Sequence, residues 1–233
     1  MPEAAGKYVT RVHRLAAGDV FVAFDPEART EADVTITSSE RTVLCDVGEL
    51  RPASVVAREP VTLLQAMGKG DKPEHVVQAA TALGVTRIVL LYSARSVPRA
   101  NDASDGKRRR YRAVAAEAAR QSGRGDLPSI EGPLPFDDAL RLVTDGLCLC
   151  LAPGADVSFA SALARWQARE PLSVLVGPEG GFDDRELEAA RKSGFVLSSF
   201  GDFVLRTETA AVAVLGAVTA LAAMRRDTLP RGS

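Results

Sequence analysis

The chain has 233 residues, of which 46% are hydrophobic and 25% are charged, and its formal net charge is −1. This composition is typical of a globular protein and excludes collagen-like and intrinsically disordered chains. The longest apolar run, residues 210–224, is shorter than the ~17–25 residues of a membrane-spanning helix. Residues 1–7 lack the apolar stretch of a secretory signal. We therefore expect a cytoplasmic protein with no membrane partner.

Basic residues are concentrated in one segment of the chain. Residues 87–124 contain ten Lys or Arg against three Asp or Glu, a local charge of +7, whereas the rest of the chain is acidic. Such segregation is typical of a surface that binds a polyanion. A solvated helix face would give the same pattern, and this alternative stays open.

Residues 1–58 are predicted to form a small β-barrel or sheet. Hydrophobic and polar residues alternate over 19–24 and 32–36, and a third strand is expected at 42–47. Glycine and Asp-Pro turn signals separate these strands.

From residue 61 the pattern changes to strands that alternate with helices. A capping box of Asp71 and Glu74 is expected to start a helix over 72–83, which Gly84 would end. Alternation of this kind predicts a parallel sheet that helices cover on both faces. The strands are expected at 61–67, 87–91, 147–151, 173–176 and 195–200, and the other helices at 107–121, 158–168, 184–192 and 207–226.

Several common catalytic sites are excluded by residue type. Only two histidines occur, His13 and His75, and neither has a cysteine nearby in the sequence, which argues against a zinc site and a Ser–His–Asp triad. The common glycine-rich phosphate-binding motifs are absent from the sequence. Cys45, Cys148 and Cys150 cannot all pair, and we interpret them as reduced residues of the core or of strands.

A glycine-rich loop follows the buried strand predicted at 173–176. The segment Gly-Pro-Glu-Gly-Gly at 177–181 leads into a helix whose start carries an Asp183/Glu186 capping box. Ligands of open α/β sheets bind at the carboxyl ends of strands, and glycines let a ligand approach the backbone. A ligand-binding loop and a plain tight turn are both compatible with these glycines.

A second loop, residues 200–210, leads into the last helix, which Thr207 is predicted to cap. Residues 210–224 are apolar nearly all round, which is typical of a helix buried on every side. We expect its own sheet and a second subunit to cover it, with Val214 and Val218 in the interface. Arg206 and Glu208 beside this stretch are either functional groups or a local ion pair.

Four segments in order resemble the RsmE-type 16S rRNA (uracil-N3) methyltransferases, which belong to the SPOUT superfamily. They are residues 69–72 with 78–85, residues 117–124 (Glu-Ala-Ala-Arg-Gln-Ser-Gly-Arg), residues 177–181, and residues 204–210 (Val-Leu-Arg-Thr-Glu-Thr-Ala). Each motif is short, but the four matches together cover residues 61–226 and are highly specific.

The resemblance implies an α/β fold with a SPOUT trefoil-knot, parallel-sheet methyltransferase domain over residues 59–233. A PUA-like β-barrel RNA-binding domain would precede it over residues 1–58. Family members usually begin with an extra strand before the segment that matches residues 8–14, so the barrel is expected to lack its first strand. The family also implies S-adenosylmethionine as methyl donor, no metal, a homodimer with the active site at its interface, and 16S rRNA or the small ribosomal subunit as partner.

Three loops of the knot would hold the donor in a bent shape, with backbone groups reading the adenine and apolar side chains covering it. By this resemblance the donor-binding residues are Leu151, Pro153, Gly154, Gly177, Pro178, Glu179, Gly180, Gly181, Phe200, Gly201, Leu205, Arg206 and Thr209. The third loop departs from the family at Asp202-Phe203, where a pair that usually carries an Arg is expected.

Methylation of uridine N3 removes a weakly acidic proton while negative charge builds up on the flanking carbonyl oxygens. Because N3 lies on the Watson–Crick edge, the base must be unpaired or splayed out. Arg124, which matches a family arginine, would steady the base or this charge, and Glu208 is the candidate proton acceptor. The candidate RNA-binding residues are Arg11, Arg14, Lys69, Lys72, Arg108, Arg109 and Arg110.

Two other functions stay open at this point. The same fold would suit a non-catalytic RNA-binding or ribosome-assembly factor, or a SPOUT enzyme that methylates the ribose 2′-oxygen. The intact loops at 177–181 and 206–210 favour an enzyme over a binding protein. The RsmE-like segments at 69–72 and 121–124 favour methylation of the base.

Overall fold

The structure is a computed structural model that describes residues 1, 3–39, 42–68, 72–96, 104–143 and 145–228. Lys69 and Asp71, which the sequence singled out, lie outside this part. Contacts divide the chain into two compact units. The first comprises Met1–Val56 and Gly123–Asp126, and the second comprises Ala57–Ser122 and Leu127–Ser233. Residues 123–126 therefore join the first unit although they are distant from it in sequence.

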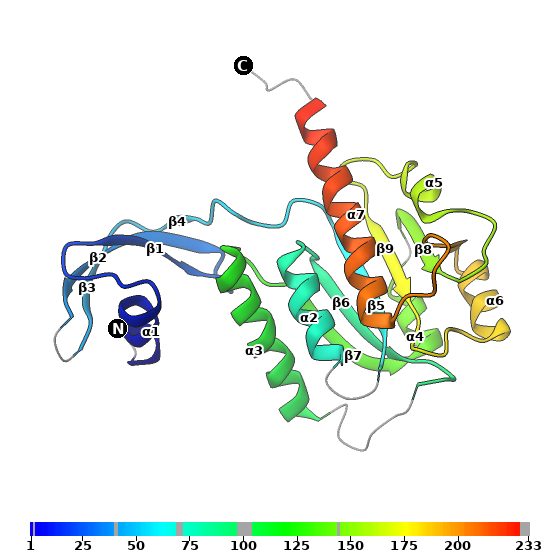
Figure 1. Ribbon diagram of the computed structural model, residues 1–233, viewed down its shortest axis with the longest axis horizontal. Coiled ribbons are helices and arrows are strands. Elements are labelled where there is room, and N and C mark those ends of the chain that lie inside the picture. The colour runs from blue at the N-terminus through cyan, green and yellow to red at the C-terminus, as the bar shows by residue number, and fades with distance from the viewer. Residues whose placement is uncertain (2, 40–41, 69–71, 97–103, 144, 229–233) are drawn as a thin grey trace. The chain divides into compact units, whose positions relative to one another are not determined.

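The first unit is built on the antiparallel sheet at the blue end of the chain in Figure 1. Strands β1, β2 and β3 lie in that order, and β4 also pairs with β2. Among the described residues β1 and β3 do not pair with each other, so the sheet is open and no closed barrel forms. The bounds are β1 Val20–Asp25, β2 Thr30–Ser38, β3 Leu44–Val47 and β4 Arg51–Pro52.

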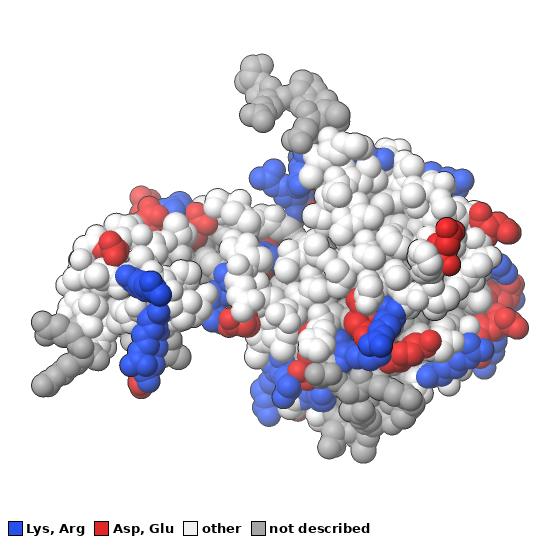
Figure 2. Space-filling model, viewed as in Figure 1, with Lys and Arg blue, Asp and Glu red and all other residues white. Residues whose placement is uncertain are grey.

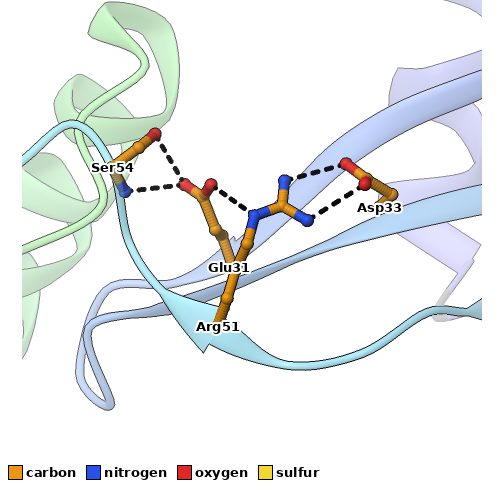
Figure 3. Close-up of polar contacts among 4 residues, drawn as sticks. All are labelled: Glu31, Asp33, Arg51 and Ser54. Atoms are coloured by element: carbon orange, nitrogen blue, oxygen red, sulfur yellow. Dashed lines mark hydrogen bonds and ion pairs between the residues drawn. The ribbon is translucent and has the colours of Figure 1, made fainter.

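An ion-pair network joins β2 to β4 (Figure 3). The Arg51 guanidinium donates to Glu31 Oε1 at 3.0 Å and to both Asp33 oxygens at 2.9 and 3.0 Å. The backbone N–H and the hydroxyl of Ser54 both donate to Glu31 Oε2, at 2.9 and 3.0 Å. The Ser54 N–H and Arg51 hold the pKa of Glu31 below its ordinary value, and Arg51 does the same for the pKa of Asp33.

Residues 3–12 are helical, whereas residues 1–58 were predicted to form a small β-barrel or sheet. Helix α1 covers Glu3–Lys7, and a turn of π-helix, η1, covers Tyr8–Val12. Lys7 donates to Glu3 one turn earlier at 2.5 Å, a pairing that favours a helix. Val9 then packs with Ile36 and Val43 in a small core. Local helical pairing and this burial explain the difference.

The second unit contains a six-stranded sheet in which every pairing is parallel, as predicted. The strand order is β10-β8-β9-β5-β6-β7. The strands are β5 Val61–Ala66, β6 Arg87–Tyr92, β7 Ser129–Pro135, β8 Leu147–Leu151, β9 Leu172–Val176 and β10 Val196–Ser198. The helices are α2 Lys72–Ala82, α3 Asp105–Ser122, α4 Phe136–Arg141, α5 Phe159–Leu163, α6 Asp184–Lys192 and α7 Thr207–Thr228.

Helices cover both faces of this sheet (Figure 1). Side chains alternate along each strand, so Leu63 faces a core formed with α2, α3, α5 and α7, while Leu64 faces a second core formed with α4 and α6. Burial on both faces explains why the strands are continuous hydrophobic runs.

Most predicted elements of this unit are confirmed, and two were missed. Gly84 ends α2 with a φ of +85°, a left-handed conformation that favours glycine. Strand β7 and helix α4 were not predicted, because Gly132, Pro133 and Pro135 in β7 are residues typical of turns. Helix α5 and strand β10 are shorter than expected.

Helix α7 is long and apolar enough to cross a membrane by length and composition alone, since residues 207–226 reach a mean hydropathy of 1.6. One face packs into the core of the second unit through Ala211, Val214, Leu215 and Val218. Val214 and Val218 are 0% and 3% exposed, so they belong to the fold of the single chain and not to an interface. Val212 of the same helix is 43% exposed, so α7 is not buried on every side within one chain.

Candidate active site

A cavity of about 200 Å³ lies at the carboxyl ends of β8, β9 and β10. These strands are neighbours in the sheet, so the loops that follow them meet. Of the predicted donor-binding residues, all except Gly180, Arg206 and Thr209 line this cavity. The lining residues that the sequence analysis did not assign are Ala152, Val176, Ser198, Asp202, Phe203, Val204, Thr207 and Ala210. Most of them are neighbours of predicted residues along the same loops, which is the signal that would have found them.

The loop after β9 is held in place from several directions. Asp183 and Glu186 form the predicted capping box of α6, with bonds of 2.8 and 3.0 Å. The other oxygen of Glu186 accepts from the backbone N–H of Ala94 at 2.7 Å. Arg95 donates to the carbonyl oxygen of Gly180. These contacts with the loop after β6 are tertiary, and sequence reasoning missed Arg95.

An ionised cluster adjoins the cavity at the start of α7. Lys72 Nζ lies 2.7 Å from Glu179 Oε1 and 3.4 Å from Glu208 Oε2. The hydrogen bond to Glu179, together with Glu208, raises the pKa of Lys72 above its ordinary value. Figure 2 shows basic and acidic side chains side by side near this end of α7. One interpretation of the sequence was a local ion pair between Arg206 and Glu208. In the structure Glu208 pairs with Lys72 instead.

Thr207 is the first residue of α7, and its hydroxyl does not cap the helix as predicted. The hydroxyl instead donates to the carbonyl oxygen of Gly177 at 2.6 Å. This bond ties the start of α7 to the loop after β9. Both residues line the cavity.

Arg124 belongs to the first unit. It is 4% exposed and donates to Asp126 through Nε at 2.7 Å and through Nη2 at 3.2 Å. The backbone N–H of Gly125 between them donates to the carbonyl of Val55 at 2.7 Å. The structure therefore places the predicted catalytic arginine in a buried ion pair of the first unit, whereas the cavity belongs to the second unit.

The predicted RNA-binding cations differ in how they are used. Arg11 and Arg14 are exposed in the first unit, and Arg108 and Arg109 are exposed on α3. Arg110 lies 2.6 Å from Glu74, and Lys107 lies 3.3 Å from the same carboxylate. Within the described chain Arg109 and Arg112 form no ion pair; Arg112 was not among the predicted residues.

Cys148 and Cys150 are buried free thiols. Burial raises the pKa of Cys150 to about 12 and also raises the pKa of Cys148. Both residues therefore stay protonated in the core at neutral pH. Among the described residues no three His, Cys, Asp or Glu side chains gather where they could hold a metal ion.

Comparisons with known proteins give the same picture. Residues 57–219 match a family model described as an RNA methyltransferase domain. The ribosomal RNA small subunit methyltransferase E of Mycobacterium bovis is 33% identical over 93% of this chain and 84% of its own length. A Legionella pneumophila methyltransferase solved in complex with bound SAM is 27% identical, with a TM-score of 0.80 over 95% of this chain and 90% of that one.

A second solved structure agrees in fold. The ribosomal RNA small subunit methyltransferase E of Neisseria gonorrhoeae, bound to S-adenosyl methionine, is 24% identical, with a TM-score of 0.79 over 95% of this chain and 90% of that one. Membership of one family of RNA methyltransferases thus explains both the parallel sheet and the four sequence segments. The chain belongs to the RsmE-type family of RNA methyltransferases.

Proposed function

We propose that this chain transfers a methyl group from S-adenosylmethionine to N3 of a uridine in 16S rRNA, by resemblance uridine 1498. Its family makes it an S-adenosylmethionine-dependent rRNA methyltransferase. The observation that carries the finer proposal is the cavity at the carboxyl ends of β8, β9 and β10, beside the cluster of Lys72, Glu179 and Glu208.

The residues around the cavity fit this donor. Glycine-rich backbone and the side chains of Leu151, Phe200 and Leu205 suit an adenosyl group, which combines apolar faces with a few polar atoms. Two acidic side chains in the wall, Glu179 and Asp202, suit a cationic ligand. When bound, the donor supplies an electrophilic methyl group, and the task of the chain is to orient the base and take its proton.

Glu208 is proposed to accept the N3 proton. Its carboxylate lies at the start of α7, and Lys72 links it to Glu179 in the cavity wall. A carboxylate fixed by a neighbouring cation is suitably placed for general base catalysis. Arg124 is proposed to steady the developing charge on the uracil carbonyls, which requires the base to reach the buried pair with Asp126.

A homodimer is part of the proposal. Phe203 and Val204 line the cavity and yet are 84% and 80% exposed, so one apolar wall of the site is open to solvent in a single chain. The surface over α7 is largely uncharged in the view of Figure 2. Val212 of α7 is 43% exposed. A second copy that covers these residues would complete the site.

The proposal is tested by methylation of small ribosomal subunits from a strain that lacks the modification, with purified protein and labelled S-adenosylmethionine. We expect one methyl group per subunit, located on uracil N3 by mass spectrometry of nuclease fragments. A methyl group on a ribose 2′-oxygen would identify a ribose methyltransferase instead. Tight binding of subunits without methyl transfer would identify a ribosome-assembly factor.

A further inference from the structure

A buried amide lies under the loop that follows β9. Gln65 belongs to β5, a central strand between β6 and β9, and is 1% exposed. Most of its neighbours on the same face are apolar. A polar side chain at such a position costs folding free energy unless all its hydrogen bonds are satisfied.

Only one orientation of this amide, with its nitrogen toward Thr207 and Ala66, is consistent with the hydrogen bonds around it. Gln65 Nε2 lies 2.8 Å from Thr207 Oγ1 and 3.0 Å from the carbonyl oxygen of Ala66. The single hydroxyl proton of Thr207 is donated to the carbonyl oxygen of Gly177 at 2.6 Å. Because carbonyl oxygens only accept, the nitrogen of Gln65 must donate to both of its partners. The amide orientation therefore follows from the network itself.

This orientation leaves Gln65 Oε1 buried, and it has no hydrogen-bond partner among the described residues. An apolar side chain of similar length would fill the same space without a buried unpaired acceptor. The oxygen of the amide is thus unfavourable for stability, whereas its nitrogen donates a hydrogen bond to Thr207.

The hydrogen bonds from Gln65 to Thr207 and from Thr207 to Gly177 form a relay that ends at the Gly177–Pro178 peptide. This peptide has few other groups that could hold it in place. The residue after Gly177 is Pro178, which has no backbone N–H, so the peptide between them offers only its carbonyl for hydrogen bonding. The Thr207 hydroxyl binds that carbonyl, and Gln65 occupies the acceptor side of the same hydroxyl. Gly177, Pro178 and Thr207 all line the cavity.

We propose that Gln65 is a positioning residue of the donor site, which acts through Thr207 to fix the Gly177–Pro178 peptide. The inference rests on the proposed function, in which S-adenosylmethionine occupies this cavity. Gln65 does not line the cavity; it determines where the wall lies. Pre-organised walls bind a ligand more tightly because less ordering is required on binding.

The test measures donor affinity and thermal stability in the same variants. Gln65→Met and Thr207→Val each remove one member of the relay with little change in volume. We expect Gln65→Met to keep the wild-type melting temperature or raise it, while calorimetry shows S-adenosylmethionine binding about tenfold more weakly. Thr207→Val should weaken binding similarly, and the double variant should be no weaker than the weaker single one, since the relay acts as a unit.

The matched control is Thr219→Val in the same helix. The Thr219 hydroxyl also bonds a backbone carbonyl outside its own helix, that of Leu83 at 2.9 Å, but the residue does not line the cavity. This control should change the melting temperature without changing donor affinity. Wild-type affinity in folded Gln65→Met, losses that multiply in the double variant, or losses that simply follow the melting temperature would overturn the inference. A wild-type protein that does not bind S-adenosylmethionine would instead overturn the proposed function.

Discussion

Lys72 shows how a cation that the sequence assigns to RNA is used within the protein. Its ammonium group lies between Glu179 of the cavity wall and Glu208 of α7, and both contacts favour the charged form. A lysine held by two carboxylates is less available to a phosphate than a free surface lysine. The contacts favour a role in positioning the proposed base.

Lys72→Met should therefore lower the single-turnover rate and leave RNA binding unchanged. We expect a loss of about tenfold, smaller than the ~100-fold or more contributed by a general base itself. Lys72→Arg, which retains the charge, should recover most of the rate, and Lys192→Met on the exposed face of α6 should have no effect. If the slope of log affinity against log salt falls by about one in Lys72→Met, the residue contacts a phosphate and this role is wrong.

Arg124 poses a different problem, because removing it breaks a buried ion pair with Asp126. Breaking such a pair typically costs about 3–5 kcal/mol, so Arg124→Gln alone should unfold at a lower temperature whatever its role. The double variant Arg124→Gln/Asp126→Asn should recover part of that stability. If Arg124 stabilises the transition state, single-turnover methylation by the double variant stays ~100–1,000-fold below wild type. Recovery of activity along with stability would contradict a catalytic role.

Among the elements, α3 is the candidate RNA surface, but its cations are not equivalent. Arg110 and Lys107 share Glu74, whereas Arg109 and Arg112 project from the helix without an ion pair in the described chain. Arg109→Gln and Arg112→Gln should each weaken binding to small subunits and reduce the salt slope by about one. Arg191→Gln on α6 is the control. Unchanged affinity and slope in both α3 variants would exclude this surface.

Helix α7 has one face for the fold and one for a proposed partner. Val212→Glu should give a folded monomer by light scattering, because Val212 is exposed in the single chain. Val214→Glu should instead prevent folding, because Val214 is fully buried against the sheet. The two substitutions are chemically identical and two residues apart, so each is the control of the other. A dimer that survives Val212→Glu would place the interface elsewhere.

The sheet of the first unit should be sensitive to acid. In the fold, the hydrogen bond from the Ser54 N–H is the main reason why the pKa of Glu31 lies below its ordinary value of 4.5. The hydrogen bonds from Arg51 hold the pKa of Asp33 below its ordinary value of 3.8. A carboxylate whose pKa is lowered in the fold stabilises the fold at any pH above the pKa that it has in the unfolded chain. This stabilisation is lost as the pH falls through the pKa of the folded state. Glu31→Gln should therefore flatten the loss of stability below about pH 4.5, measured by thermal unfolding, whereas Glu27→Gln at an exposed site should not. An identical acid response in both variants would contradict this account.

At the scale of the whole molecule, the sequence predicted what depends on pattern. Alternating strands and helices predicted the parallel sheet, and the resemblance carried by the motifs at 177–181 and 204–210 predicted part of the cavity wall. Those features are local, because hydrophobic period and glycine placement are properties of a short segment. The family resemblance also predicted the part of the cavity wall at 151–154, a segment that has no strong motif of its own.

The rest depends on contacts between distant segments, which no local pattern encodes. Gln65, Lys72 and Arg95 act on loops that lie far from them along the chain. Arg124 follows a helix of the second unit yet pairs within the first. The N-terminal helix also depends on tertiary burial, since Val9 is covered by residues of the sheet.

The central claim is that the cavity at the carboxyl ends of β8, β9 and β10 holds S-adenosylmethionine. Calorimetric titration of the donor into the wild type, Gly180→Val and Ala152→Phe tests it most directly. The atoms nearest to a Cβ at Gly180 would belong to the flexible side chain of Arg95, with Cδ at 3.1 Å, whereas Ala152 lines the cavity. We expect the wild type and Gly180→Val to bind and folded Ala152→Phe to lose binding. Wild-type affinity in folded Ala152→Phe, or no binding to the wild type, would contradict the account.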